Sequence, residues 1–270
     1  MEEIQQIAKD IRKTIYKIAH YAGGGHMGAA FSIADIITVL YFGSVLRYDV
    51  ANPEWEDRDR FVLSKGHACY ALYAVLAKAG FFSENELWSV GKPGSRLGGH
   101  PKLHEIPGVE ASTGALGHGL SFAIGIAYAN KVDDRRSHTY VILGDGECQE
   151  GSVWEAALFI SQHKLNNLTL IIDNNRIQAT GKTEDILNVE SLVDKWRAFG
   201  FDTVSVNGHD FEALESGINI CKNAEKPAVL IANTIKGKGV SYIENHEHWH
   251  YRMPEKEEES VGRKQLGFGE

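Results

Sequence analysis

Short oxygen-bearing side chains follow two apolar segments of the sequence, thirty residues apart. The run 140–143 is followed by Gly144-Asp145-Gly146, and the run 168–172 is followed by Asp173-Asn174-Asn175. A carboxylate at Asp145 and a side-chain carbonyl at Asn175, with a backbone carbonyl and phosphate oxygens, are ligands that suit a hard cation such as Mg²⁺. The glycines on either side of Asp145 allow a diphosphate to approach the backbone closely.

Parallel strands are the elements that would position these side chains. Both apolar runs are typical of buried strands, and residues 152–163 between them have a helical period. A strand–helix–strand unit of this length brings the carboxyl ends of its strands together at one edge of a sheet. The alternative is two ordinary turns, in which glycine supplies a positive φ and asparagine a left-handed cap.

The rest of the chain extends this unit into a larger sheet. Periodicity predicts further helices over 2–21, 32–43 (with Ser32 as N-cap), 68–79, 116–130, 191–199 and 210–221, and further strands over 60–63, 203–206 and 228–234. This alternation predicts an α/β fold, a doubly wound and mostly parallel sheet with helices on both faces. The Gly-, Pro- and His-rich residues 89–118 predict a long loop, a kind that is usually functional or disordered. We expect one domain over residues 1–252 and a charged tail over 253–270.

Composition argues against several classes of function. The chain has 270 residues, of which 43% are hydrophobic, which is enough for a sizeable core. The net charge of −8 and the absence of a basic stripe argue against nucleic-acid binding. The sequence contains no apolar run that could span a membrane and no apolar signal core at its start. Three cysteines without metal spacing indicate reduced thiols, so we expect a cytoplasmic protein.

Histidines lie beside glycines or at the ends of predicted elements in five places. These are His26 in GGGHMG, His67 in LSKGHA, His100 in GGHP, His118 in GALGHG and His250 in EHWHY. In a doubly wound fold such loops can converge at one rim of the sheet. Imidazole can donate, accept and relay protons near neutral pH, so a cluster of histidines suits chemistry on a phosphorylated polyhydroxy substrate. Each histidine alone could instead cap a backbone carbonyl, and a zinc site from the histidines of 246–250 would lack Cys or carboxylate partners.

Taken together, these segments resemble a known family. GDG followed by NN at this spacing resembles the thiamine diphosphate motif, and the whole series GGGHMG, FVLSKGHA, GGHP, TGALGHG, GDGECQEG, DNNRIQATG and TIKGKG resembles the diphosphate-binding domain of transketolase. The resemblance covers about residues 5–252. Complete transketolases continue with a pyrimidine-binding domain and a C-terminal domain. The resemblance therefore implies an N-terminal subunit of a split enzyme, which would pair with a separate C-terminal subunit in a heterotetramer of two copies of each chain.

The resemblance also implies roles for matching positions. Mg²⁺, for which Ca²⁺ or Mn²⁺ can substitute, would be held by Asp145, Asn175 and the backbone carbonyl of Ile177. Thiamine diphosphate would be contacted by His67, Gly114, Leu116, Gly146 and Asn175, with Lys65 and Lys236 near its diphosphate. The sugar would face the catalytic histidines, His26, His100 and His250. Glu150 resembles a glutamate of the family's dimer interface that is thought to couple two cofactors. The sequence departs from the family pattern at His118, usually Gln, and at Ala29, which is Ser in some members.

The implied activity is transfer of a two-carbon ketol unit from a ketose phosphate, such as xylulose 5-phosphate, to an aldose phosphate, such as ribose 5-phosphate. The cofactor would carry the difficult chemistry. His26 or His250 would act first as base and then as acid. A glutamate of the pyrimidine-binding domain activates the cofactor in this family, so the chain alone is expected to be inactive.

Three alternatives remain open on the sequence. One is another thiamine diphosphate enzyme, such as 1-deoxyxylulose-5-phosphate synthase or a 2-oxo-acid dehydrogenase E1 component. A second is a transketolase that acts on an unusual sugar, such as a sulfo-sugar or a branched pentulose. The third is a non-catalytic Rossmann-like binding module, although the first predicted strand is not followed by G-x-G-x-x-G.

Overall fold

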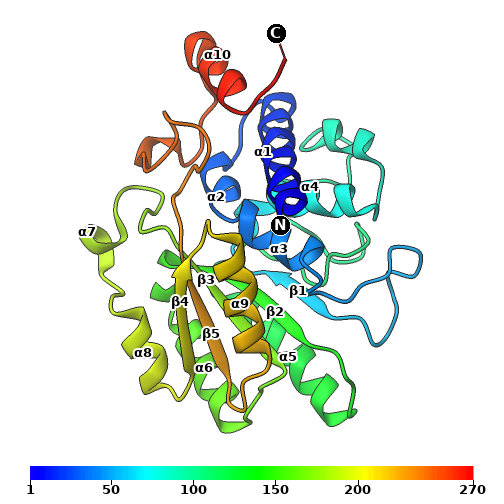
Figure 1. The fold of residues 1–270 in the computed structure, drawn as a ribbon, viewed down its shortest axis with the longest axis vertical. Coiled ribbons are helices and arrows are strands. Elements are labelled where there is room, and N and C mark those ends of the chain that lie inside the picture. The colour runs from blue at the N-terminus through cyan, green and yellow to red at the C-terminus, as the bar shows by residue number, and fades with distance from the viewer. Residues whose placement is uncertain (270) are drawn as a thin grey trace.

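The computed structural model describes residues 1–269 and contains one five-stranded sheet (Figure 1). Its strands are β1 (Arg60–Leu63), β2 (Thr139–Gly144), β3 (Leu168–Asn174), β4 (Asp202–Asn207) and β5 (Ala228–Asn233). They lie in the order β1-β2-β3-β5-β4, and all neighbouring pairs are parallel. The predicted α/β fold with a parallel sheet is confirmed.

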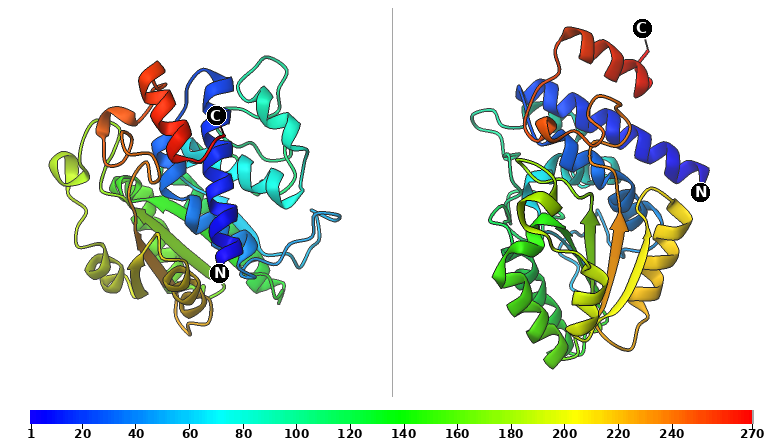
Figure 2. Two further views of the ribbon diagram at one scale, coloured as in Figure 1. Left: turned by 45° about the horizontal axis from the view of Figure 1, so that its top comes forward. Right: turned by 90° about the vertical axis from the view of Figure 1, so that its left-hand side faces the viewer.

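Helices cover both faces of this sheet, because the strands alternate their side chains between two apolar clusters. The first cluster contains Phe61, Leu63 and residues of α1 (Glu2–Ala22), α2 (Met27–Ser32), α3 (Ala34–Phe42), α4 (Cys69–Ala79) and α9 (Phe211–Lys222). The second contains Val62 and residues of α5 (His118–Val132), α6 (Gly151–Gln162) and α8 (Leu192–Ala198). Figure 2 shows α5 and α6 on one side of the strands and α9 on the other.

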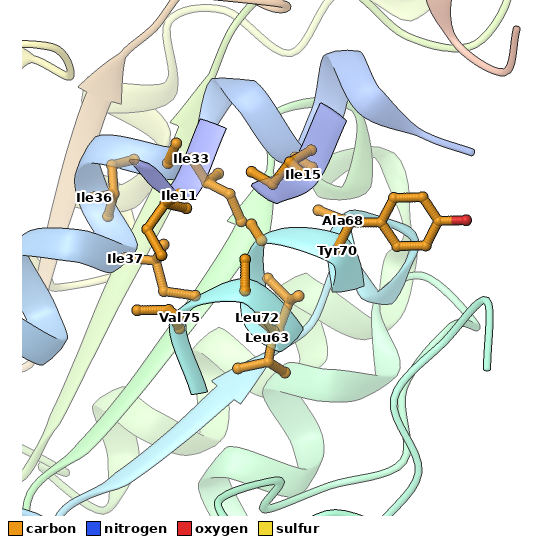
Figure 3. Packing of buried hydrophobic residues seen from close by; sticks show 14 of the residues in the cluster. Ile11, Ile15, Ile33, Ile36, Ile37, Leu63, Ala68, Tyr70, Leu72 and Val75 are labelled. Atoms are coloured by element: carbon orange, nitrogen blue, oxygen red, sulfur yellow. The ribbon is translucent and has the colours of Figure 1, made fainter. Parts of the chain in front are cut away.

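The larger cluster anchors the chain segments that lead to the functional edge of the sheet. Figure 3 shows isoleucines of the α1–α3 segment packed against α4 and the end of β1; the labelled residues are Ile11, Ile15, Ile33, Ile36, Ile37, Leu63, Ala68, Tyr70, Leu72 and Val75. All of these side chains are buried. Each large aliphatic side chain stabilises the fold by about 1.5–3 kcal/mol on burial. The turn at residues 64–67 is therefore held between a buried strand and a buried helix.

The predicted helix over 32–43 is wrong in its start and in its cap. The structure has two helices, α2 and α3, that meet at Ile33, and Ser32 is the last residue of α2. The Ser32 hydroxyl does not cap a helix; it donates to the Asp173 carboxylate, with an Oγ–Oδ1 distance of 2.6 Å. A buried charged acceptor at the end of β3 has displaced the local capping interaction.

The charged segment 253–270, predicted as a tail, contains the helix α10 (Lys256–Gln265). Glu255 and Glu258 form a capping box at its start, and Gly262 lies so close to Tyr242 and Tyr16 that a Cβ would clash. Leu266 is buried in the larger apolar cluster. Glu270, the end of this segment, lies outside the described residues.

The predicted long loop is present between the 3₁₀ helix η2 (Glu84–Ser89) and α5. Residues 90–117 contain no helix or strand. The loop is fastened to the sheet by Thr113, whose hydroxyl donates to the Leu63 carbonyl at 2.7 Å. Across residues 1–269, none of the helices combines the length and the apolar character that crossing a membrane requires.

Candidate active site

The two strand ends that were predicted to lie together do so. Gly144 at the end of β2 is opposite Asp173 of β3, and the Asp145 amide donates to the Asp173 carbonyl at 3.1 Å. Asp145 and Asn175 directly follow these neighbouring strand ends, and both are buried. The carboxyl edge of the sheet therefore carries a carboxylate and an amide side by side.

A cavity of about 320 Å³ opens at this edge. The predicted site residues in its wall are His26, Lys65, His67, Gly114, Leu116, Asp145, Gly146, Glu150, Asn175, Ile177, Lys236 and His250. His100 does not line the cavity, but its ring centroid lies 6.4 Å from that of His26. Loops that are far apart in the sequence thus converge on one site.

Lys65 is held in the cavity wall by a buried ion pair. Its ammonium lies 2.5 Å from Asp173 Oδ2, and both side chains are almost fully buried. Hydroxyls of Ser32 and Thr234 also donate to this carboxylate. Burial alone would raise the pKa of Asp173, but the Lys65 ammonium and these hydroxyls outweigh it and hold the pKa below its usual range. Asp173 is therefore an ionised anchor that positions the Lys65 charge.

Lys236 places a second ammonium in the same wall. Its Nζ donates to the carbonyls of Ile177, at 3.2 Å, and Gln178, at 2.9 Å. Burial and the nearby Lys65 charge lower the pKa of Lys236 to about 8. Two ammonium groups that face one cavity favour an anionic ligand there.

Three imidazoles form one side of the cavity. The ring centroid of His26 lies 4.9 Å from that of His250 and 5.2 Å from that of His67. Burial, followed by His100 and the two lysines, lowers the pKa of His26 to about 4, and burial and Lys236 lower that of His250 to about 4. Burial also places the pKa of His67 well below its usual value. At neutral pH these rings are uncharged and can accept or donate a proton.

The backbone conformation at Gly114 also contributes to the shape of the cavity wall. Its φ of +152° is one that side-chain-bearing residues rarely adopt, and a Cβ there would lie 2.8 Å from His100 Cδ2. A side chain at this position would therefore collide with the ring of His100, which belongs to the same loop.

The family of the chain follows from comparison with known proteins. A family model described as the thiamine diphosphate binding domain of transketolase matches residues 4–270. The chain belongs to the transketolase family. This confirms the resemblance read from the sequence.

Transketolase relatives match nearly the whole chain. An apulose-4-phosphate transketolase subunit of Phocaeicola vulgatus is 44% identical over 264 residues, or 97% of this chain and 93% of the relative. The 6-deoxy-6-sulfo-D-fructose transketolase subunit SqwG of a Clostridium species is 41% identical over 243 residues, or 90% and 88%. The structure of Campylobacter jejuni transketolase superposes with a TM-score of 0.93 at 33% identity, over 99% of this chain and 43% of that one. The chain thus spans less than half the length of that transketolase.

The oxygen atoms at the strand ends fit a divalent cation bound to a diphosphate. The Asn175 amide donates to Asp173 Oδ2 at 2.9 Å and to Ser32 Oγ at 3.2 Å, which directs its carbonyl oxygen away from them. Asp145 Oδ2 accepts from the Thr183 hydroxyl at 2.7 Å, and burial raises the pKa of this carboxyl. A bound cation would favour its ionised form. The Ile177 carbonyl already accepts from a cationic group, Lys236.

Sequence reasoning assigned no role to two buried carboxylates beside this cavity, Asp173 and Glu147. Asp173 ends an otherwise apolar strand, and a buried charge there signals a buried cationic partner. Glu147 accepts from the Ser64 hydroxyl at 2.5 Å and from the amides of Gly117 and Gly144 at 2.8 and 3.1 Å. No local signal separates Glu147 from Glu150, since both lie in the same turn.

The two positions that depart from the family pattern have different surroundings. His118 is exposed, lies outside the cavity wall, and has its Nδ1 3.2 Å from the Leu116 carbonyl. Ala29 lines the cavity, and its carbonyl accepts from Lys65 Nζ at 3.3 Å. Only the second of these departures changes a surface that a ligand would touch.

Proposed function

We propose that this chain and a separate C-terminal subunit form a transketolase that moves a two-carbon ketol unit from a ketose phosphate to an aldose phosphate. The observation that carries the proposal is the single cavity where uncharged histidines face the lysine- and oxygen-lined strand ends. Thiamine diphosphate, when bound, supplies the electron sink for breaking the carbon–carbon bond. The chain supplies binding, orientation and proton transfer.

Each side of the cavity has its own role in this proposal. Asp145, Asn175 and the Ile177 carbonyl hold Mg²⁺, and Lys65 and Lys236 offset the charge of the diphosphate. His26 and His250 are the candidates for accepting and returning the substrate hydroxyl proton, because burial lowers their pKa values and leaves both rings uncharged at neutral pH. His100, an exposed residue whose ring centroid lies 6.4 Å from that of His26, is proposed to orient substrate hydroxyls from outside the cavity wall.

The partner is proposed to be a chain that carries the pyrimidine-binding domain. Two relatives of similar length are named as subunits, and the Campylobacter jejuni enzyme is more than twice as long as this chain. Exposed apolar side chains on α5 and α6, among them Phe122 and Leu158, support a larger assembly, which we propose to be a heterotetramer.

The identity of the donor sugar is the most specific part of the proposal. Xylulose 5-phosphate with ribose 5-phosphate is the general transketolase pair. The names of the relatives support apulose 4-phosphate and 6-deoxy-6-sulfo-D-fructose as competing donors for this chain. A subunit of another thiamine diphosphate enzyme, similar to 1-deoxyxylulose-5-phosphate synthase, is the second candidate.

A coupled ketol-transfer assay with thiamine diphosphate and Mg²⁺ tests this proposal. The three donors are compared with the chain alone and with its partner subunit, and we expect turnover only in the mixture. His26→Gln should lower kcat by about 10²–10⁴-fold, as expected for loss of an acid–base group. His118→Gln, outside the cavity, is the matched control and should keep kcat. Turnover by the chain alone would refute the split enzyme, and no cofactor binding by the mixture would refute the function.

A further inference from the structure

Gln178 has a side-chain amide without a hydrogen-bond partner in the cavity wall. The residue directly follows Ile177 in the loop after β3 and lines the cavity. Its Nε2 is buried and pairs with no atom of the described chain. Buried N–H groups are nearly always paired, because they lose hydration on burial. An acceptor that arrives with a ligand would satisfy this donor.

The backbone of Gln178 is fixed on both sides. Its amide donates to the Gly181 carbonyl at 2.8 Å, and its carbonyl accepts from Lys236 Nζ at 2.9 Å. Ile177 and Lys182 close the same turn through an antiparallel bridge. The side chain therefore starts from a defined position, and its amide is directed by the fold.

The side chain lies against the turn that follows β2. A Cβ on Gly146 would come within 2.9 Å of Gln178 Cγ and 3.5 Å of Nε2. The unpaired donor thus lies over Gly146, which also lines the cavity. Neither neighbouring carboxylate is its acceptor: the hydrogen bonds to the Asp145 and Glu147 side chains come from the hydroxyls of Thr183 and Ser64 and from backbone amides.

We infer that Gln178 Nε2 donates a hydrogen bond to a diphosphate oxygen of bound thiamine diphosphate. The inference rests on the proposed function and adds a binding residue that the motif pattern does not contain. Diphosphate oxygens only accept hydrogen bonds, which matches a donor whose surroundings also include the Lys236 ammonium. Hydrogen bonds to charged acceptors are the stronger ones.

Calorimetric titration of the complex of this chain with its partner subunit tests the inference. Thiamine diphosphate and inorganic diphosphate are titrated separately in the presence of Mg²⁺. Gln178→Met keeps the side-chain length and removes the donor, so the Kd of both ligands should rise about tenfold or more. Gln178→Glu places a negative charge at the same point and should raise the Kd of both ligands further.

Gln149 provides a matched control in the same cavity. Its Nε2 already donates to the Leu187 carbonyl at 2.7 Å, so Gln149→Met should leave the affinity for inorganic diphosphate unchanged. Thermal unfolding of each variant shows that it is folded.

The possible outcomes separate this inference from the function itself. If both Gln178 variants bind both ligands as the wild type does, the inference is overturned and the proposed function stands. If they lose affinity for thiamine diphosphate but keep it for inorganic diphosphate, the amide faces another part of the cofactor and the inference is overturned. If the wild-type complex binds no thiamine diphosphate, the proposed function and the inference fall together.

Discussion

Asp173 is the residue on which the site's architecture most depends. Its carboxylate joins α2, the turn after β1, β3 and the segment after β5 through Ser32, Lys65 and Thr234. Burying a charge is unfavourable unless partners replace its hydration. The Lys65–Asp173 pair meets that condition and presents the lysine to the cavity at the same time.

Lys65→Met should strongly destabilise the chain, because it leaves the Asp173 carboxylate buried without a cation. Removing one partner of a buried pair typically costs about 3–5 kcal/mol. Urea unfolding at neutral pH measures the loss. The control is Lys182→Met, since Lys182 and its partner Glu184 are both well exposed and 3.8 Å apart, and such pairs contribute about 0–1 kcal/mol. Equal losses in the two variants would contradict the role of Asp173.

At the scale of elements, the C-terminal helix α10 is held to the body by close packing. Gly262→Ala should disrupt this contact, because the added methyl group clashes with the Tyr242 and Tyr16 hydroxyls. Overpacking typically costs about 1–3 kcal/mol. Limited proteolysis followed by mass spectrometry should show faster cleavage around α10. Ser260→Ala, on an exposed position of the same helix, is the control and should keep the wild-type cleavage rate.

The sequence could predict those elements whose own residues show an apolar run, a helical period or the glycines of a loop. The apolar runs before Asp145 and Asn175 are buried on both faces, so their strand character and adjacency were evident. The cavity loops were also recognisable, because their glycines and histidines mark irregular backbone. The predicted site residues, whose roles came from the resemblance to transketolase, all lie in or beside one cavity.

The elements that sequence missed depend on distant partners. Ser32 has the composition of an N-cap, but a carboxylate 141 residues away takes its hydroxyl. The segment around α10 is dominated by Glu and Lys and lacks an apolar stripe, yet Leu266 and Gly262 pack onto the body. Only the tertiary structure determines which of these interactions forms.

At the scale of the whole molecule, one buried histidine, His138, and two partly buried ones, His26 and His250, couple stability to pH. His26, His138 and His250 each have a pKa of about 4 in the fold, against 6.5 for a free histidine, mainly because of burial. As the pH falls below 6.5, these histidines therefore bind protons in the unfolded chain, whereas in the folded chain they bind protons only near pH 4. The free energy of unfolding should fall as the pH drops through this window. The midpoints of urea unfolding at pH 7.5, 6.5 and 5.5 measure this loss of stability.

The variant His138→Gln separates the contribution of this histidine to the pH dependence of stability from the contributions of other groups. His138 directly precedes β2 and does not line the cavity, and its Nε2 lies 2.8 Å from Thr169 Oγ1 of β3. The variant should lose less stability than the wild type between pH 6.5 and 5.5. The same slope in both proteins would exclude a contribution from this histidine.

The surface of α5 and α6 should be covered in the proposed assembly. Phe122, Tyr128, Leu158 and Phe159 are exposed there, and the rings of Tyr128 and Phe159 lie 5.6 Å apart. Leu158→Glu should reduce association with the partner subunit in native mass spectrometry without lowering the thermal midpoint of the isolated chain. Ile220→Glu, exposed on α9 in the opposite layer, is the control. Equal association of the two variants would place the contact elsewhere.

The position of α10 has a consequence for protein engineering. The helix α10 lies beside α1, at the end of the molecule toward which the strands point (Figure 1). A flexible linker that continues from α10 to a second polypeptide would start on the side of the sheet where the strands end, which is also the side of the cavity. This chain and the proposed partner subunit could thus be joined into a single-gene fusion, which would replace a concentration-dependent encounter by a tethered one and remove the need to match expression levels.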